Sequence, residues 1–176
     1  MSVQSEPGGR RLVVMRHGKA EPGGETDAVR ELAQRGWNDA LAAGRWLAGS
    51  AITPDGALVS SARRTRSTWL AVAEGGSFEA EASYSDSLYS AGPETALDLV
   101  RETDDDVTTL LVIGHNPTMA YLAQLLDDGS GDEEAHREMA VGFPTSALAV
   151  FEVTVSWASL ELASARLIAF HAARTR

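Results

Sequence analysis

The stretch LVVMRHGKA at residues 12–20 places a short apolar run directly before an arginine, a histidine and a glycine. An apolar run that ends in this way predicts a buried strand leading into a loop. The stretch LLVIGHNP at residues 110–117 has the same form, and its first four residues are the most apolar run of the chain. His17 and His115 therefore each follow the carboxyl end of an expected core strand, the edge at which open α/β sheets bind ligands.

The rest of the chain predicts strands alternating with helices. Between Leu32 and Ala48 the apolar residues follow the spacing of one helix face, and Asn116 and Pro117 suit the N-cap and first position of a later helix. We expect helices at 32–48, 62–73, 93–102 and 118–126, and further strands at 57–60, 78–84, 146–155 and 166–170. This alternation predicts an α/β fold with a mainly parallel sheet.

Two segments are expected to lie outside this framework. Residues 1–10, MSVQSEPGGR, are polar and contain a Pro-Gly-Gly breaker, which predicts a flexible tail before a single domain at 11–176. Residues 127–138 are acidic and contain glycine, which we interpret as a solvated loop.

The composition is that of one globular domain. The chain has 176 residues, of which 44% are hydrophobic and 23% charged, enough to bury a core. Its 25 acidic and 15 basic residues give a formal net charge of −10, which argues against general nucleic-acid binding. Cysteine is absent, which excludes disulfides and a thiol nucleophile. Without a long apolar run or a secretion signal, we expect a cytoplasmic protein that does not bind membranes.

The four histidines fall into two pairs. We expect His136 and His171 to be surface residues, whereas His17 and His115 follow core strands. A single histidine in such a place is most often a partly buried structural residue. That interpretation weakens when cationic side chains gather at the same edge.

Arginines accompany the strand ends although the chain is acidic. They are Arg16, Arg30, Arg63, Arg64 and Arg66. A guanidinium group donates two hydrogen bonds to phosphate oxygens through its planar fork, so this edge predicts a phosphate site. The helix expected after His115 would add the positive end of its dipole.

Such a site suits histidine as a nucleophile. Surrounding cations disfavour imidazolium, so one histidine would stay neutral at pH 7, attack phosphorus and form a covalent phosphoenzyme. The second histidine, if protonated, would donate to the oxygens on which charge gathers. Arginines that supply this charge make magnesium unnecessary, and we expect no metal and no other cofactor.

Five segments carry a family resemblance. They are LVVMRHGKA at 12–20, RELAQRG at 30–36, VSSARRTRST at 59–68, VIGHNP at 112–117 and FPTSA at 143–147. In this order they resemble an Arg-His-Gly motif, an Arg-x-Leu-x-x-x-Gly segment, a Ser-Pro-x-x-Arg-Ala-x-Gln-Thr segment, a second histidine motif and a turn. These belong to the small SixA-like branch of the histidine phosphatase superfamily, also called phosphoglycerate mutase-like. The resemblance spans residues 12–170 and implies a three-layer α/β/α sandwich.

The resemblance implies the catalytic residues. His17 would be the phosphorylated nucleophile, and Arg16 would bind the phosphoryl oxygens. His115 would be the second histidine. The family's other arginine stands four residues after its serine, here Ser60, which identifies Arg64.

Other positions are less determined by the family pattern. Arg30 is either a phosphate-assisting residue at the rim or an ordinary surface arginine, and we interpret Arg63 and Arg66 as solvated helix residues. Ser61 and Thr65 replace the family's usual proline and alanine, which we expect to change loop stiffness more than chemistry.

The general acid is the main departure. Larger relatives place a carboxylic acid in an insertion after the third segment, whereas only 50 residues separate Arg64 from His115 here. Asp86 and Glu94 are the available carboxylates, and neither sits in a recognisable motif. Imidazole leaves more easily than an alcohol, which needs a proton donor, and a short chain leaves the pocket open. Both points favour phosphohistidine on a protein.

The resemblance therefore implies a phosphohistidine phosphatase acting on a histidine phosphocarrier or phosphotransfer domain. The alternative is a broad phosphomonoesterase acting on small phosphoesters with the same residues. A mutase is disfavoured because the short chain lacks a closed pocket. A non-catalytic phosphate-binding module is disfavoured because both histidines and both core arginines are retained.

Overall fold

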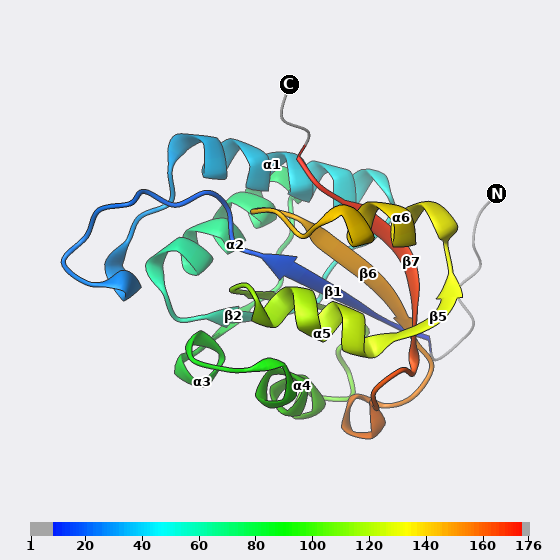
Figure 1. The fold of residues 1–176 in the computed structure, drawn as a ribbon. Helices are drawn as coiled ribbons and strands as arrows, with labels where there is room; N and C mark the ends of the chain where they lie inside the picture. The colour runs from blue at the N-terminus through cyan, green and yellow to red at the C-terminus, as the bar shows by residue number, and fades with distance from the viewer. Residues whose placement is uncertain (1–8, 174–176) are drawn as a thin grey trace.

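Seven strands form one sheet in the order β3-β2-β4-β1-β6-β7-β5 (Figure 1). The computed structural model describes residues 9–173. The strands are β1 (Arg10–Arg16), β2 (Gly56–Ser60), β3 (Ala82–Ser85), β4 (Thr109–Gly114), β5 (Asp127–Gly131), β6 (Leu148–Val153) and β7 (Ala165–His171). Strands β3, β2, β4 and β1 are parallel, as are β5 and β7, whereas β6 is antiparallel to both of its neighbours. The predicted mainly parallel sheet is confirmed.

Helices cover both faces of the sheet and give the expected three layers (Figure 1). They are α1 (Gln34–Gly49), α2 (Arg63–Gly76), α3 (Asp86–Tyr89), α4 (Pro93–Arg101), α5 (Thr118–Leu126) and α6 (Glu133–Val141), with 3₁₀ turns η1 (Asp27–Val29) and η2 (Trp157–Ser159). Val13 and Met15 of β1 face a core with α1 and α2, whereas Leu12 and Val14 face one with α4 and α5. A strand covered on both faces is apolar at every position, which explains the continuous run at 12–15.

Glycines bring α1 and α2 into backbone contact. A Cβ on Gly44 of α1 would lie 2.1 Å from the carbonyl oxygen of Val72, and one on Gly75 of α2 would lie 2.1 Å from that of Leu41. Only hydrogen fits at these two positions. The close approach holds the C-terminal half of α2, whose first turn carries Arg64, against α1.

The segment 127–138 is not the solvated loop that its composition predicted, because it forms β5 and the first part of α6. The backbone of β5 pairs with β7, and Gly131 packs against the carbonyl of Leu167. The helix begins with a local signal, since the Asp132 side chain accepts a hydrogen bond from the Ala135 N–H at 2.8 Å. The sequence did not predict β5 because this strand forms by backbone pairing with β7, which is distant in the chain.

The two remaining histidines are also more enclosed than predicted. His136 is half-buried, and its Nε2 lies 2.8 Å from the carboxylate of Asp127. His171 is half-buried as well, and its ring stacks on Trp46 with centroids 5.0 Å apart. Both side chains remain partly exposed, so they lie at the surface as expected, but each is held by a neighbouring side chain.

Smaller differences concern the ends of elements. Most of the expected tail at 1–10 lies outside the described residues, but Arg10 is already the first residue of β1. The expected strand at 78–84 is β3, shorter and at the sheet edge. Helix α5 has Pro117 at its N-cap, while the Asn116 side chain accepts from the Ala120 N–H at 3.2 Å. Within residues 9–173, every helix is too short or too polar to span a bilayer.

Candidate active site

The two strand-end histidines meet at one edge of the sheet. Strands β1 and β4 are parallel neighbours, and Arg16 pairs in register with Gly114. The residues that follow them, His17 and His115, therefore leave the sheet side by side. Their ring centroids lie 5.2 Å apart.

His17 has one committed and one uncommitted ring nitrogen. Its Nδ1 lies 2.7 Å from the carbonyl oxygen of Gly18. A carbonyl only accepts hydrogen bonds, so the neutral ring carries its proton on Nδ1 and its lone pair on Nε2. Burial is the main cause that lowers the pKa of His17 to about 4; the Gly18 contact raises it, and the charges of Arg64, Arg16 and Arg30 lower it. At pH 7 this side chain is a neutral imidazole with an available lone pair.

His115 has both ring nitrogens engaged by side chains. Its Nδ1 accepts from Arg64 Nη2 at 3.2 Å, so its proton is on Nε2 and is donated to Ser60 Oγ at 2.7 Å. Burial first, then the nearby His17 and Arg64, lower the pKa of His115 to about 3. At pH 7 His115 is therefore a neutral imidazole. The expected role, in which a protonated His115 donates to phosphoryl oxygens, would require it to gain a proton.

The two core arginines carry donors without acceptors. Arg64 is buried, and its Nη1 and Nη2 donate to the backbone oxygen and carboxylate of Asp27 at 2.8 and 3.0 Å. Arg16 Nη1 donates to the carbonyl oxygen of Phe143 at 3.2 Å. The Nε–H groups of Arg16 and Arg64 are buried with no hydrogen-bond partner among the described residues. A buried unpaired donor costs about 1–3 kcal/mol, which indicates a place made for an anion.

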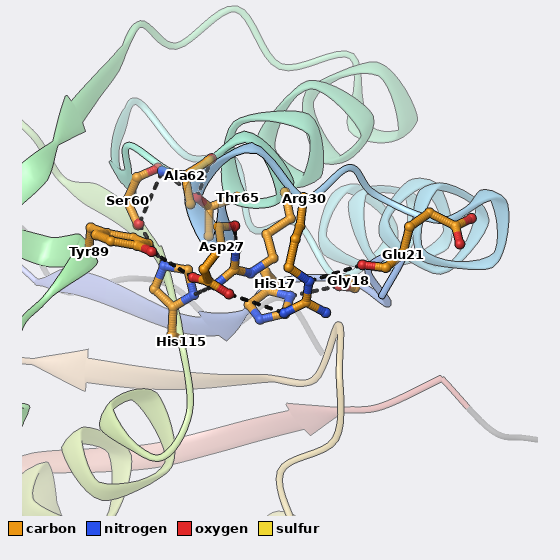
Figure 2. A network of polar contacts seen from close by, with 11 residues as sticks. His17, Gly18, Glu21, Asp27, Arg30, Ser60, Ala62, Thr65, Tyr89 and His115 are labelled. Carbon is orange, nitrogen blue, oxygen red and sulfur yellow. Dashed lines mark hydrogen bonds and ion pairs between the residues drawn. The ribbon is translucent and has the colours of Figure 1, made fainter. Parts of the chain in front are cut away.

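Asp27 is the functional candidate that the sequence reasoning missed. Its carboxylate accepts from Tyr89 Oη at 2.6 Å, from Arg64 Nη2 at 3.0 Å and from Arg30 Nη1 at 3.2 Å. Figure 2 shows it between Tyr89 and Arg30, beside His115. The hydrogen bonds from Tyr89 and Arg64 hold its pKa well below the usual range for aspartate. Nothing in the local sequence distinguishes Asp27 from other loop carboxylates, except its place one turn before Arg30.

The three other arginines considered from the sequence lie in two places, one at the rim of the site and two on the exposed side of α2. Arg30 lies at the rim, partly exposed, with Nε donating to the backbone oxygen of Glu21 at 3.0 Å. Arg63 pairs with the exposed Glu31, and Arg66 lies over the ring of Tyr84. Arg63 and Arg66 are both exposed, so the interpretation of these two as solvated helix residues is confirmed.

Among residues 9–173, neither carboxylate proposed as a general acid contacts the site through a hydrogen bond. Asp86 and Glu94 begin α3 and α4, where both are exposed. Within the described part of the chain, neither hydrogen-bonds to a histidine or arginine of the site. Asp27 is the carboxylate that does, and it does so as an anion.

Thr65, which replaces the family's usual alanine, is accommodated at the start of α2 by hydrogen bonds of its hydroxyl group. Thr65 Oγ1 donates to the carbonyl oxygens of Ser60 and Ala62 at 2.6 and 2.7 Å. One turn later, Thr68 Oγ1 accepts from the Gly18 N–H at 3.0 Å and donates to the Arg64 carbonyl at 2.7 Å. Thr68 therefore links the β1 loop to the helix that carries Arg64.

The turn at 143–147 supports the same edge from the antiparallel side. The carbonyl oxygen of Phe143 accepts from Arg16 and also from Asn116 Nδ2 at 2.9 Å. The Ser146 N–H donates to the backbone oxygen of His17 at 3.0 Å. This turn fixes both the guanidinium of Arg16 and the backbone of the histidine beside it.

The loop that carries Asp27 and Arg30 is closed at its base. Ala20 and Leu32 form an isolated antiparallel bridge. Below it, a Cβ on Gly36 would lie 2.2 Å from the carbonyl oxygen of Lys19, and one on Gly18 would lie 2.8 Å from that of Gly36. The glycines of the first two motifs are thus required by one backbone contact.

The site is built for an anion. Among residues 9–173, no cluster of three or more histidine, aspartate or glutamate side chains could hold a metal ion. The groups that converge are two neutral imidazoles and three guanidinium groups, and these are donors suited to phosphoryl oxygens.

Known proteins resemble the chain over nearly its whole length. No model of a known protein family matches it. An uncharacterized protein of Mycobacterium tuberculosis is 42% identical over 162 residues, which cover 91% of this chain and all of that protein. A structure assigned as phosphohistidine phosphatase SixA from Nakamurella multipartitia has 34% identity and a TM-score of 0.83, covering 94% of this chain and 96% of that one. One with the same assignment from Agrobacterium tumefaciens has 31% identity and a TM-score of 0.77, covering 93% and 98%.

Proposed function

This chain belongs to the SixA-like branch of the histidine phosphatase superfamily, and on that premise we propose that it is a phosphohistidine phosphatase. It would remove phosphate from histidine-phosphorylated proteins, such as a phosphocarrier or phosphotransfer domain, through a covalent intermediate on His17. Arg16, Arg64 and His115 would be the other catalytic residues, and Arg30 would bind substrate at the rim.

One observation carries the proposal. The lone pair on Nε2 of His17 lies among arginines whose buried Nε–H groups have no partner in the described part of the chain. A phosphoryl group supplies both what the nucleophile attacks and the oxygens that those donors lack. A structural histidine would require neither the free lone pair nor the unpaired donors.

The first step transfers phosphorus between two imidazoles. Nε2 of His17 forms a bond to phosphorus as the P–N bond of the substrate breaks, with the guanidinium groups binding the three equatorial oxygens. If the distal nitrogen of the substrate ring already carries a proton, that ring leaves as neutral imidazole. No proton from the enzyme is then needed.

The Gly18 carbonyl prepares the second step. Because it keeps the proton on Nδ1, phosphorylated His17 is already the protonated form whose P–N bond is labile. A water molecule then attacks phosphorus, the P–Nε2 bond breaks, and a proton of that water ends on the phosphate oxygens. His17 returns to the neutral Nδ1–H form with which it began.

The carboxylates support phosphohistidine as the substrate class. An alcohol leaving group gains about 10²–10⁴-fold from a proton donor. Asp27 is an anion bound by Tyr89 and Arg64, so it has no proton to give. Asp86 and Glu94 are exposed, and within residues 9–173 neither hydrogen-bonds to a histidine or arginine of the site. A ring that leaves neutral is the substrate that this arrangement suits.

The test is the mass of the intact protein after brief incubation with N-phosphoimidazole, quenched without acid, for the wild type and His17→Ala. We expect one added phosphoryl group on the wild type and none on the variant. Equal turnover in both proteins would contradict the role of His17. Turnover of sugar phosphates or p-nitrophenyl phosphate as fast as that of a phosphohistidine peptide would instead favour the broad phosphomonoesterase.

A further inference from the structure

A groove adjoins the candidate active site on the side of Arg16. A cavity of about 680 Å³ is lined by Arg16 together with Val141, Phe143 and Phe170. A second cavity of about 430 Å³ extends toward Trp46 of α1. The two share four lining residues, namely Glu138, Phe170, Ala172 and Ala173, so they form one continuous groove.

The groove and the candidate phosphate site share the side chain of Arg16. Arg16 lines it and also donates to the Phe143 carbonyl oxygen. The charge of Arg16 reaches both site histidines, because it contributes to lowering the pKa of His17 and of His115. Whatever lies in the groove therefore lies beside the phosphoryl group that Arg16 would bind.

The near end of the groove is apolar. Phe143 and Phe170 pack edge to face with centroids 5.5 Å apart. Val141, at the end of α6, is 92% exposed, the largest value among the large hydrophobic side chains of the described residues. Val141, Phe143 and Phe170 line the same cavity as Arg16, so this apolar side chain and the two rings lie together next to a polar site.

The flanks of the groove are acidic. Apart from Arg16, the charged side chains that line it among the described residues are Glu134, Glu138 and Asp39. The whole chain has a net charge of −10, so an acidic partner would be repelled on approach. A partner that brings a basic residue beside an apolar one would be complementary to this face.

We propose that this groove binds the segment that flanks the phosphohistidine of the protein substrate, and that it selects a segment with an apolar and a basic side chain. The proposal rests on the proposed function. The apolar side chain packs on Val141 and the two phenylalanines, and the basic one faces Glu138. The groove thus determines which phosphohistidine proteins are substrates, while Arg16 and His17 act on the phosphoryl group itself.

The test compares two peptides with a central phosphohistidine. One carries leucine and lysine within four residues of the histidine, and the other carries serine and glutamate there. N-phosphoimidazole, which has no flanking residues, is the reference substrate. We expect kcat/KM of the wild type to be about tenfold higher for the first peptide, which corresponds to about 1.4 kcal/mol. Equal values for the two peptides would overturn the proposal.

Two variants locate the effect. Val141→Glu should lower kcat/KM for the leucine-lysine peptide, relative to N-phosphoimidazole, by about tenfold. Glu138→Lys should shift the preference toward the serine-glutamate peptide. The matched control is Leu162→Glu, because Leu162 is also an exposed apolar residue and does not line the groove. Unchanged ratios in both groove variants would place the selection elsewhere and refute the assignment.

Failure of the proposed function would look different. If the wild type hydrolysed neither N-phosphoimidazole nor a phosphopeptide, the phosphatase assignment would fall. Binding of the unphosphorylated peptides, followed by fluorescence anisotropy, would still decide on the groove. A preference for the leucine-lysine peptide that Val141→Glu removes would support it, and equal binding of both peptides would refute it.

Discussion

The segments that follow β1 and β4 start from paired positions on neighbouring strands, but they hold their histidines in opposite ways. His17 is hydrogen-bonded to the backbone, through Nδ1 to the carbonyl oxygen of Gly18, which leaves the lone pair on Nε2. His115 is bonded to side chains at both nitrogens, by Ser60 from β2 and by Arg64 from α2. Equivalent places in the fold therefore give the two rings different hydrogen-bond partners, and we propose that these partners decide the role of each ring.

The contrast extends to how each ring is supported. The β1 segment is tied by the Ser146 N–H on the His17 carbonyl and by Thr68 on the Gly18 N–H. The orientation of His115 depends on the same guanidinium that Asp27 holds. Side-chain substitutions should therefore disturb the β4 side first, while the β1 side keeps its geometry.

The largest effect should come from exchanging each histidine for asparagine. His17→Asn should lower turnover of N-phosphoimidazole by about 10⁴-fold or more, because no nucleophile remains. His115→Asn should lower it by about 10²–10³-fold, because it removes one stabilising group. Rapid quenching followed by intact mass should find phosphoenzyme in His115→Asn and none in His17→Asn.

Circular dichroism and thermal unfolding of the two variants serve as controls for folding. If both variants lost phosphoenzyme while remaining folded, the distinction between the two histidines would be wrong. Phosphoenzyme in folded His17→Asn would move the nucleophile to another residue.

Asp27→Asn should have the next largest effect, and it should fall on the β4 side. Loss of a charged hydrogen-bond partner of Arg64 is worth about 1.5–3 kcal/mol, so kcat/KM should fall by about 10–100-fold. We expect the change mainly in KM, with phosphoenzyme still forming on His17, as steady-state and burst kinetics would measure.

Glu31→Gln is the matched control for this change. Glu31 belongs to the same loop and also pairs with an arginine, Arg63, but both are exposed. Such a pair contributes little, so its removal should change kcat/KM by less than about twofold. Equal losses in the two variants would mean that the loop, and not the Asp27 carboxylate, is what matters.

The pH dependence tests what the two rings have in common. Both pKa values lie below the ordinary 6.5, at about 4 for His17 and about 3 for His115. Between about pH 3 and 6.5 these two histidines therefore bind fewer protons in the folded protein than in the unfolded chain. Their contribution to stability is complete above about pH 6.5 and is lost as the pH falls toward 4.

The measurement is an NMR titration of the Cε1–H signals together with urea unfolding. Neither ring should titrate between pH 7.5 and 5, while the urea midpoint should fall over the same range, by less in His115→Asn than in the wild type. Titration of the His17 ring near pH 6.5 would contradict a neutral nucleophile, and titration of the His115 ring there would contradict a neutral second histidine.

Ser60→Ala should have the smallest effect. It removes a neutral acceptor from His115 Nε2, worth about 0.5–1.5 kcal/mol, so activity should fall by about 2–10-fold. Because Arg64 still holds Nδ1, phosphoenzyme formation should persist in rapid-quench experiments. An effect as large as that of His115→Asn would show that the serine, and not the arginine, positions the ring.

Local sequence patterns were sufficient where the structure depends on local causes. The apolar runs predicted β1 and β4, and the helical spacing after Leu32 predicted α1. The strand-end rule brought His17, His115 and the arginine of α2 to one edge. The glycine-containing acidic segment failed as β5, because its pairing depends on β7, more than thirty residues later.

Asp27 was missed for the same reason as β5, because its contacts are with residues far away in the chain. Asp27 joins the candidate site only because its loop folds back onto Arg64 and Tyr89, which are 37 and 62 residues away in the chain. Ser60 was visible as a motif position, but its contact with His115 follows from the pairing of β2 with β4. Contacts across the fold assign these roles, and a single sequence holds no local sign of them.

The closed base of the loop at 21–31 has a consequence for engineering and descent. The bridge between Ala20 and Leu32 and the glycine contact beneath it isolate the loop from the sheet. The loop can therefore be exchanged as a unit between relatives, provided that Gly18, Gly36 and the hydrogen bonds of Asp27 with Arg64 and Tyr89 are kept. The other residues of the loop can then change in number and type while His17 keeps its position, so one scaffold can acquire new specificities without rebuilding its core.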